Sequence, residues 1–175
     1  MARIRELTQR EDVAEAQRQA FDEIVASRGS IRGPFGVLLH SPELARRAAH
    51  LGAYLRYESS LDPRVRETAV MATAAVLDCT YEWAAHEPQA RAAGVPADVI
   101  EAIRARRAQD LPEDARDIYT LATCILDQHR VPADLFERLQ ARLGTTGLIE
   151  IVAAIGYWAF VAATLNTFEV MPNSS

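Results

Sequence analysis

One nine-residue window holds most of the side chains in this sequence that could do chemistry. It reads Asp78-Cys79-Thr80-Tyr81-Glu82-Trp83-Ala84-Ala85-His86. In a helix, positions 79, 82, 83 and 86 are separated by three, four or seven residues, so their side chains share one face. A thiol, a carboxylate, an indole and an imidazole gathered on one helix face predict a functional site.

The chemistry of these groups is acid/base or nucleophilic. We expect Cys79 in the first turn of a helix, where free N–H groups and the helix dipole favour a thiolate. His86 can exchange a proton near neutral pH, and Glu82, one turn earlier, can fix its tautomer or act as a second acid/base group. Glu67 is a fourth candidate, because a carboxylate in a largely apolar segment is costly without a partner.

Simpler interpretations of the same residues stay open. Cys79 can be a packing thiol, and Glu82 with His86 an ordinary surface pair. Trp83 fits a core or a subunit interface as well as a substrate-binding wall. His40 precedes a predicted helix and could reach a substrate, although an exposed loop position also fits it. The four donor side chains match no common zinc pattern, so we expect neither a metal nor another cofactor.

Composition excludes several classes of protein. With 175 residues, 49% apolar and 25% charged, the chain fits one soluble domain spanning residues 1–175. The net charge of −5 and the lack of a long basic run argue against nucleic-acid and membrane partners. All 19 basic residues are arginine, which excludes mechanisms that need a lysine amine, such as pyridoxal-phosphate chemistry. Two distant cysteines and no visible secretory signal favour the cytoplasm.

The hydrophobic pattern is helical throughout, with no convincing two-residue period. Prolines stand near predicted helix starts and glycines beyond predicted ends. The last segment, residues 147–168, is nearly long enough to span a membrane, but Glu150 and Asn166 within it favour a buried helix. The expected helices cover about residues 11–27, 42–57, 63–77, 79–93 (with Asp78 as its cap), 96–106, 112–129, 132–143 and a final one from 145 or 146, with residues 31–40 as a loop. The sequence therefore predicts an all-α bundle.

The spacing of the four candidate residues resembles a known motif. The alkyl hydroperoxidase D group of the carboxymuconolactone decarboxylase-like family has Glu-x11-Cys-x2-Cys-x3-His, and Glu67, Cys79 and His86 match it. The run YLRYESSLDPRVRETAVMATAAVLDCTYEWAAHEPQARAAGVPADVIEAIR resembles the central region of that family. With the flanking GPFGVLLHSPELA and the final apolar helix, the resemblance covers about residues 30–170. It implies a single-domain helical bundle of that type.

The sequence departs from this motif at Glu82, which stands where the second cysteine is expected. A peroxidase cycle that closes a local disulfide is therefore excluded. A one-cysteine peroxidase or antioxidant activity through Cys79, with an external thiol, stays open. So does a catalytically silent helical oligomer.

The decarboxylase members of the family imply a different use of the same residues. Loss of carbon dioxide from a carboxylated lactone leaves an enolate, which needs a general acid to return a proton to carbon. His86 would be that acid, Glu67 or Glu82 its partner, and Trp83 a pocket wall. An arginine could hold the substrate carboxylate, and the candidates are Arg56, Arg64 and Arg66.

The resemblance also implies a homo-oligomer, either a dimer, a trimer or a hexamer, with sites near subunit contacts. The partner expected for each site is a small-molecule substrate.

Overall fold

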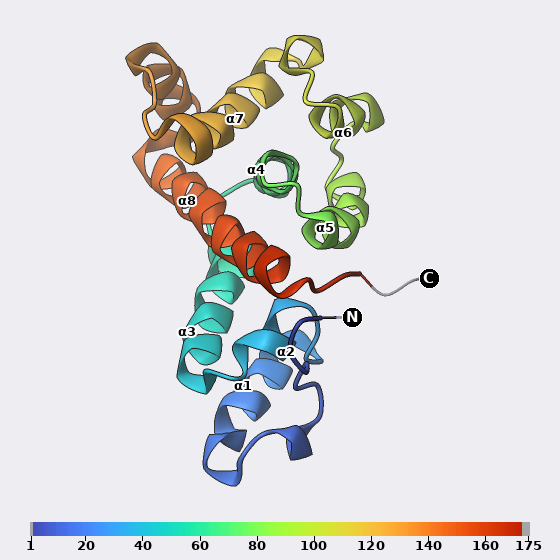
Figure 1. The fold of residues 1–175 in the computed structure, drawn as a ribbon. Coiled ribbons are helices and arrows are strands. Elements are labelled where there is room, and N and C mark those ends of the chain that lie inside the picture. Colours follow the sequence, from blue (N-terminus) through green and yellow to red (C-terminus); the bar gives the residue numbers. More distant parts are fainter. Residues whose placement is uncertain (1, 173–175) are drawn as a thin grey trace. The chain divides into compact units, whose positions relative to one another are not determined.

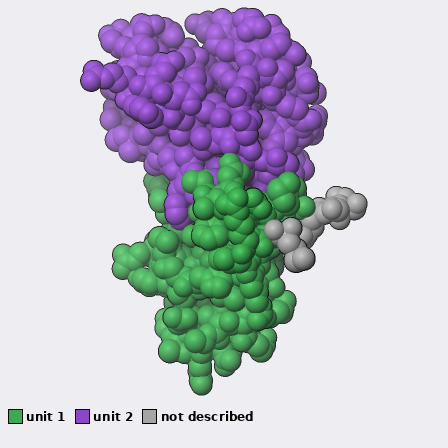
Figure 2. Space-filling view, in the orientation of Figure 1, with its two compact units in different colours: residues 1–58, 163–175 green, residues 59–162 purple. Residues whose placement is uncertain are grey.

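The described chain, residues 2–172 of a computed structural model, is built from helices alone, and the predicted all-α fold class is confirmed. Its helices form two compact units, coloured separately in Figure 2. Residues 2–58 and 163–172 belong to unit 1, and residues 59–162 belong to unit 2. Unit 2 contains the whole predicted motif.

Unit 1 begins with two short 3₁₀ turns and continues with helices (Figure 1). These elements are η1 (Arg10–Asp12), η2 (Glu15–Gln17), α1 (Arg18–Arg28), α2 (Pro34–Leu38), α3 (Pro42–Ala53) and the π-helical turn η3 (Tyr54–Glu58). The first helix starts later than predicted, because Asp12 accepts hydrogen bonds from the N–H groups of Thr8 and Gln9 and holds a turn there.

The prediction that residues 31–40 form a loop is wrong, because α2 lies within this segment. Gly33 has φ +59°, and Pro34 supplies the fixed φ that suits the first helical position. All five residues of α2 are buried. Gly33 and Pro34, which indicated a loop, thus start a short buried helix that contains Gly36.

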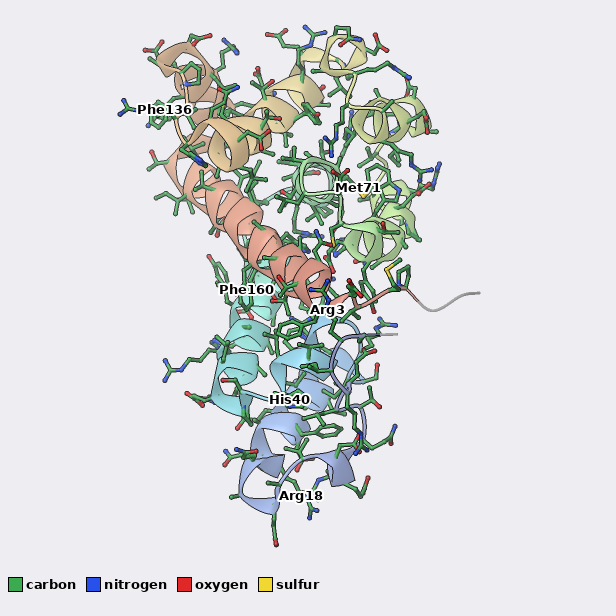
Figure 3. All side chains as sticks on the ribbon, viewed as in Figure 1. Arg3, Arg18, His40, Met71, Phe136 and Phe160 are labelled. Atoms are coloured by element: carbon green, nitrogen blue, oxygen red, sulfur yellow. The ribbon has the colours of Figure 1, made fainter. Side chains whose placement is uncertain are left out.

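Unit 2 is organised around α4 (Pro63–Val76), which Figure 1 shows nearly end-on among its neighbours. It contacts α5 (Thr80–Ala92), α6 (Ala97–Arg104) and α7 (Glu113–Thr123). Every residue from Glu67 to Ala75 is buried, and Met71, labelled in Figure 3, is completely so. The turns η4 (Ala108–Asp110) and η5 (Cys124–Gln128) complete the unit together with α8. A helix apolar nearly all round thus lies at the centre of the unit, as its pattern indicates.

The two ends of α4 explain how the motif is set up. At its start, Asp62 accepts a hydrogen bond from the Arg64 N–H at 2.8 Å, as predicted for an N-cap followed by proline. At its end, Asp78 takes the left-handed conformation with φ +50°. The prediction that Asp78 caps α5 is therefore wrong, and Cys79 occupies the N-cap position. Aspartate tolerates this left-handed turn, and its carboxylate binds Arg106.

The last helix, α8 (Ala133–Phe168), is divided by Gly144, whose φ of 68° and ψ of 174° are non-helical. This break confirms the predicted helix end at that glycine. By length and composition α8 could cross a membrane, yet 61% of its most apolar window is buried inside the fold, as in the core helix of a soluble protein.

Glu150 gives a test of how α8 is anchored within unit 2. Its buried carboxylate accepts hydrogen bonds from the N–H and hydroxyl of Ser60, at 2.8 and 2.6 Å. We predict that Glu150→Gln lowers the free energy of unfolding by about 1–3 kcal/mol, because charge-assisted bonds to a buried acceptor are weakened. Urea titration measures this change. The exposed Glu137→Gln on the same helix should stay within about 0.5 kcal/mol, and an equal effect of both would contradict the anchor.

Candidate active site

The predicted motif is assembled around a buried pair of side chains in unit 2. Glu67 from α4 and His86 from α5 are 3% and 1% exposed, and Glu67 Oε2 lies 2.8 Å from His86 Nδ1. Arg66 reaches the other oxygen of Glu67, with Nε 3.3 Å from Oε1. Burial by itself would raise the pKa of Glu67, but the hydrogen bond with His86 and the charges of His86 and Arg66 outweigh it and lower that pKa. Glu67 is therefore a carboxylate at neutral pH.

Two further groups face the other ring nitrogen of His86. Trp158 from α8 donates its indole N–H to Nε2 at 3.1 Å, and the two rings meet edge to face at 89°. Glu82, one turn before His86 on α5, places Oε2 3.4 Å from the same nitrogen. All three side chains are buried. The imidazole is thus held by groups from three helices.

Cys79 lies at the junction between this buried cluster and a cavity. Its backbone is extended at the N-cap of α5, and its N–H donates to the Ala74 carbonyl oxygen at 2.9 Å. Burial raises the pKa of the thiol, more than the N–H groups of Glu82 and Tyr81 lower it. The expectation that the helix start favours a thiolate is therefore not met. Cys79 keeps its proton at neutral pH.

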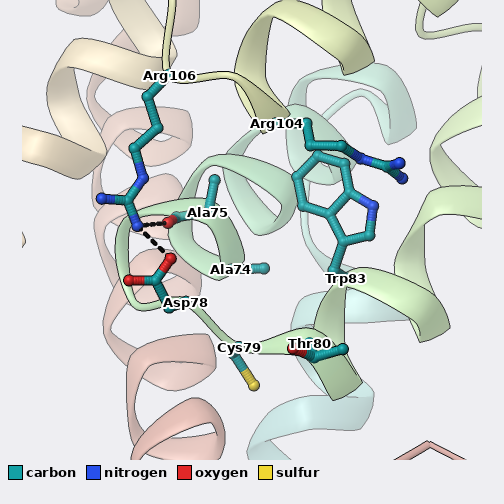
Figure 4. A pocket seen from close by; sticks show the side chains of 8 residues that line it. All are labelled: Ala74, Ala75, Asp78, Cys79, Thr80, Trp83, Arg104 and Arg106. Carbon is teal, nitrogen blue, oxygen red and sulfur yellow. Dashed lines mark hydrogen bonds and ion pairs between the residues drawn. The ribbon is translucent and has the colours of Figure 1, made fainter.

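The cavity beside Cys79 has a volume of about 300 Å³, at the small end of the roughly 300–1,000 Å³ typical of ligand pockets. Figure 4 shows Thr80 and Trp83 on one side of it and Arg106 with Asp78 on the other. The lining residues are Ala74, Ala75, Asp78, Cys79, Thr80, Trp83, Arg104 and Arg106. The two arginines and one aspartate in this lining favour an anionic ligand.

Trp83 is held as a wall of this cavity by its neighbours. Its indole N–H donates to Glu87 at 2.9 Å, and the Arg104 guanidinium carbon lies 4.8 Å from its ring centroid. Arg104 also binds Glu87, and Arg91 reaches the same carboxylate at 2.7 Å. Trp83 therefore lines the cavity, and its role in binding a substrate stays a prediction.

The other residues chosen from the sequence lie elsewhere. His40 belongs to unit 1, where its exposed side chain places Nε2 2.8 Å from the Arg5 carbonyl oxygen. Of the candidate arginines, Arg56 also belongs to unit 1, Arg66 binds Glu67, and Arg64 pairs with Asp114 at 3.6 Å. None of these four side chains lines the cavity of unit 2.

Sequence reasoning missed Trp158, Arg104 and Arg106. Trp158 carries a weak signal, because an indole N–H inside an apolar helix needs a buried acceptor. The arginines carry none, because their positions near the end of α6 look like ordinary exposed ones. In residues 2–172 no group of three or more His, Cys, Asp and Glu side chains is arranged to hold a metal ion.

Comparison with solved structures identifies the fold. An uncharacterized peroxidase-related protein with an alkylhydroperoxidase AhpD core, from Ralstonia eutropha JMP134, is 23% identical with a TM-score of 0.77, covering 99% of this chain and 93% of its own. The debrominase Bmp8 is 16% identical with a TM-score of 0.73, covering 95% and 92%. A peroxidase-related protein from Silicibacter sp. TM1040 is also 16% identical, with a TM-score of 0.73 and coverage of 93% and 87%.

Sequence comparison identifies the family. A search of curated proteins finds no match. Residues 42–126, which run from the start of α3 into η5 and contain the whole motif, match the model of the Carboxymuconolactone decarboxylase family. On this match and the alkylhydroperoxidase-type fold, the chain belongs to the carboxymuconolactone decarboxylase-like family.

Proposed function

We propose that this protein is an enzyme that transfers protons to and from a small carboxylated or lactone-type organic acid, in the manner of a carboxymuconolactone decarboxylase. The observation that carries the proposal is the place of Cys79, which is among the residues that line a ligand-sized cavity and lies beside the buried acid/base groups Glu82 and His86. The family includes decarboxylases, and the proposed reaction needs no electron acceptor. It needs a positioned acid, which this site offers.

The proposed step is a decarboxylation that ends in protonation of carbon. The bond between the substrate carbon and its carboxylate breaks, carbon dioxide leaves, and the electron pair remains as an enolate. The S–H bond of Cys79 then breaks, and its proton forms the new C–H bond. A thiol whose pKa is raised by burial is suited to this task, because it holds a proton at neutral pH, and Cys79 is one of the residues that line the cavity.

The buried cluster would return a proton to the Cys79 thiolate. Glu82 is close enough for its carboxyl charge to act on the thiol, and His86 lies directly behind Glu82. His86 itself is 1% exposed and does not line the cavity. The sequence suggested His86 as the acid that meets the substrate, whereas the geometry favours a role one step behind Glu82.

The cavity lining suits a small, flat anion. Its apolar side is formed by Ala74, Ala75 and the Trp83 ring, and Arg104 lies over that ring. The Arg104 bonds that the structure records use Nη2, which leaves Nε and Nη1 for a carboxylate. We propose Arg104 and Trp83 as the residues that bind substrate.

We also propose that the protein works as a cytoplasmic homo-oligomer, a dimer, trimer or hexamer, without nucleic-acid, membrane or cofactor partners. The acidic composition supports the absence of polyanionic partners. The exposed apolar residues Ile149 and Val152 on α8 are compatible with subunit contacts. Sedimentation of the purified protein would measure its oligomeric state.

The first test of the proposed reaction compares the two cysteines. We predict that Cys79→Ser lowers kcat for a lactone acid by roughly 10²–10⁴-fold, because a hydroxyl is a much weaker acid than a thiol. Cys124→Ser, a matched change of a buried thiol outside the cavity, should leave kcat within about threefold. Release of carbon dioxide from a panel of carboxylated lactones measures turnover. Equal activity of both variants would rule out Cys79 as the acid.

The second test compares two arginines that bind the same carboxylate. Arg104 and Arg91 both contact Glu87, but only Arg104 lines the cavity. We predict that Arg104→Met raises KM about tenfold or more, the loss of roughly 1.4 kcal/mol of binding, while kcat changes less. Arg91→Met should leave KM unchanged. If both substitutions act alike, Arg104 contributes only through Glu87.

A one-cysteine peroxidase is the second candidate, favoured by the position of Cys79 in the cavity and by the peroxidase-related proteins that share this fold. In that reaction the sulfur attacks a peroxide oxygen, the O–O bond breaks, and an alcohol leaves. Two molecules of an external thiol then reduce the sulfenic acid, with release of water and a disulfide.

A catalytically silent helical oligomer is the remaining alternative. It would be favoured if the protein shows neither decarboxylase nor peroxidase activity and the Cys79 and Arg104 variants lose only stability.

Alkylation of Cys79 separates the two candidates. Its raised pKa predicts that reaction with iodoacetamide stays slow at neutral pH and accelerates only above the ordinary thiol value of about 9. Mass spectrometry of the modified peptide follows the rate. Fast alkylation near pH 7, together with peroxide consumption lost in Cys79→Ser, would support the peroxidase and contradict the acid role.

A further inference from the structure

Three side chains of α5, spaced four residues apart, are joined in a line along the helix. They are Trp83, Glu87 and Arg91. Glu87 accepts a hydrogen bond at each oxygen, from the Trp83 indole N–H to Oε2 at 2.9 Å and from Arg91 Nη2 to Oε1 at 2.7 Å. Residues four apart are neighbours on a helix surface. The helix itself therefore fixes the place of the Glu87 carboxylate.

Arg104 joins this line from α6. Its Nη2 binds Glu87 Oε2, and its Cζ lies 4.8 Å from the centroid of the Trp83 ring. Figure 4 shows the Arg104 and Trp83 side chains next to each other at the cavity. A carboxylate and an aromatic face together restrict a side chain that otherwise has many rotamers. Arg104 is thus ordered in the protein without a ligand.

Glu87 acts on the cavity only through its neighbours. It does not belong to the cavity lining, and its side chain is 23% exposed. The hydrogen bond from Arg91, followed by those from Trp83 and the charge of Arg104, lowers the pKa of Glu87 against the opposing effect of burial, so the group is ionised at neutral pH. Its Oε2 contacts both residues that we propose to bind substrate, Trp83 and Arg104.

Glu87 can influence an anion in the cavity in two opposite ways. Its charge offsets that of Arg104, so removing it would tighten binding by roughly one- to fivefold, the range for exposed charge pairs, and salt would screen this effect. Its hydrogen bonds also hold Arg104 in place. Without them a ligand would have to order this long side chain, which costs roughly two- to tenfold in affinity. The two effects differ in sign and in their dependence on salt.

We propose that Glu87 is a positioning residue that holds Arg104 and Trp83 in the orientation in which they bind a carboxylate. This inference rests on the proposed function in one respect, which is that a small carboxylate is the ligand of the cavity. Binding of such an anion can be measured without turnover. The role of Glu87 can therefore be tested apart from the reaction.

Calorimetric titration with furan-2-carboxylate, a small flat anion, measures this role. We expect Glu87→Leu to raise the Kd about tenfold in about 0.5 M salt, where the change in charge is screened. Glu87→Gln keeps an oxygen that can accept hydrogen bonds from Trp83 and Arg104. It should therefore stay within about threefold of the native Kd.

Glu43→Leu is the matched control. Glu43 is an exposed carboxylate on α3 that is also bound by two arginines, Arg46 at 2.9 Å and Arg47 at 2.7 Å. It belongs to unit 1 and does not line the cavity of unit 2. This variant should leave the Kd for furan-2-carboxylate unchanged.

The indole N–H resonance of Trp83 reports the positioning directly. Trp83→Phe assigns it, because that variant keeps the resonance of Trp158. The hydrogen bond to a carboxylate should shift the native resonance downfield, with Glu87→Leu returning it toward the value of a free indole and Glu87→Gln lying between them. Furan-2-carboxylate should move the native resonance, and in Arg104→Met only at roughly tenfold higher concentration.

Three outcomes would overturn the role of Glu87. A lower Kd in Glu87→Leu than in the native protein would show that Glu87 acts through its charge alone. Equal Kd values in Glu87→Gln and Glu87→Leu, in variants shown to be folded by circular dichroism, would show that the acceptor oxygen plays no part. Failure of the native protein to bind furan-2-carboxylate would contradict carboxylate binding at Arg104.

Turnover keeps this inference separate from the proposed function. If the Kd values and the resonance change as expected and no carboxylated lactone is turned over, the proposed function fails while the role of Glu87 stands. If turnover is present, Glu87→Leu should raise KM by the same factor as the Kd, with kcat within about threefold of native. An unchanged KM would overturn the role of Glu87 in binding substrate.

Discussion

The hydrogen bond between Glu67 and His86 is the constraint around which unit 2 is arranged. It places a carboxylate and an imidazole where each is at most 3% exposed, and such groups are tolerated inside a protein only when their polar atoms are paired. The pairing takes Arg66 on one side and Trp158 on the other, so α4, α5 and α8 must each present one residue at a fixed point. The contacts that hold these three helices together are therefore the same contacts that fix the geometry of the site.

The site separates a residue that lines the cavity from the side chains that are closed off behind it. Cys79 lines the cavity, while His86 is closed off behind Glu82. The turn at Asp78 produces this arrangement, because it ends α4 in a left-handed residue and leaves Cys79 as the extended N-cap of α5. From there the face of α5 carries Glu82 and His86 inward. One local backbone feature thus sets which side of the cluster is accessible.

Much of the fold follows from local sequence. Proline after a capping residue marks the start of α4, and Gly144 marks the break in α8, because these residues act on the backbone where they stand. The same local rules failed at two places. At α2, Gly33 and Pro34 start a buried helix where a loop was predicted. At Asp78, a left-handed turn stands where a helix cap was predicted. At α2 the burial of all five residues decided between two conformations that the local sequence permits, and at Asp78, whose side chain is exposed, the left-handed turn is accompanied by the contact with Arg106.

The sequence by itself determined the motif: helical spacing puts Cys79, Glu82 and His86 on one face of α5, whatever surrounds them. It also indicated Glu67 as a buried carboxylate in need of a partner. The tertiary structure decided which partner that is, 19 residues away, and brought Trp158 to the same ring from 72 residues away. It also decided that the pKa of Cys79 is raised, since burial depends on the neighbouring helices and outweighs the helix start. The neighbours of the His86 ring and the burial of the Cys79 thiol arise from contacts that no local pattern encodes.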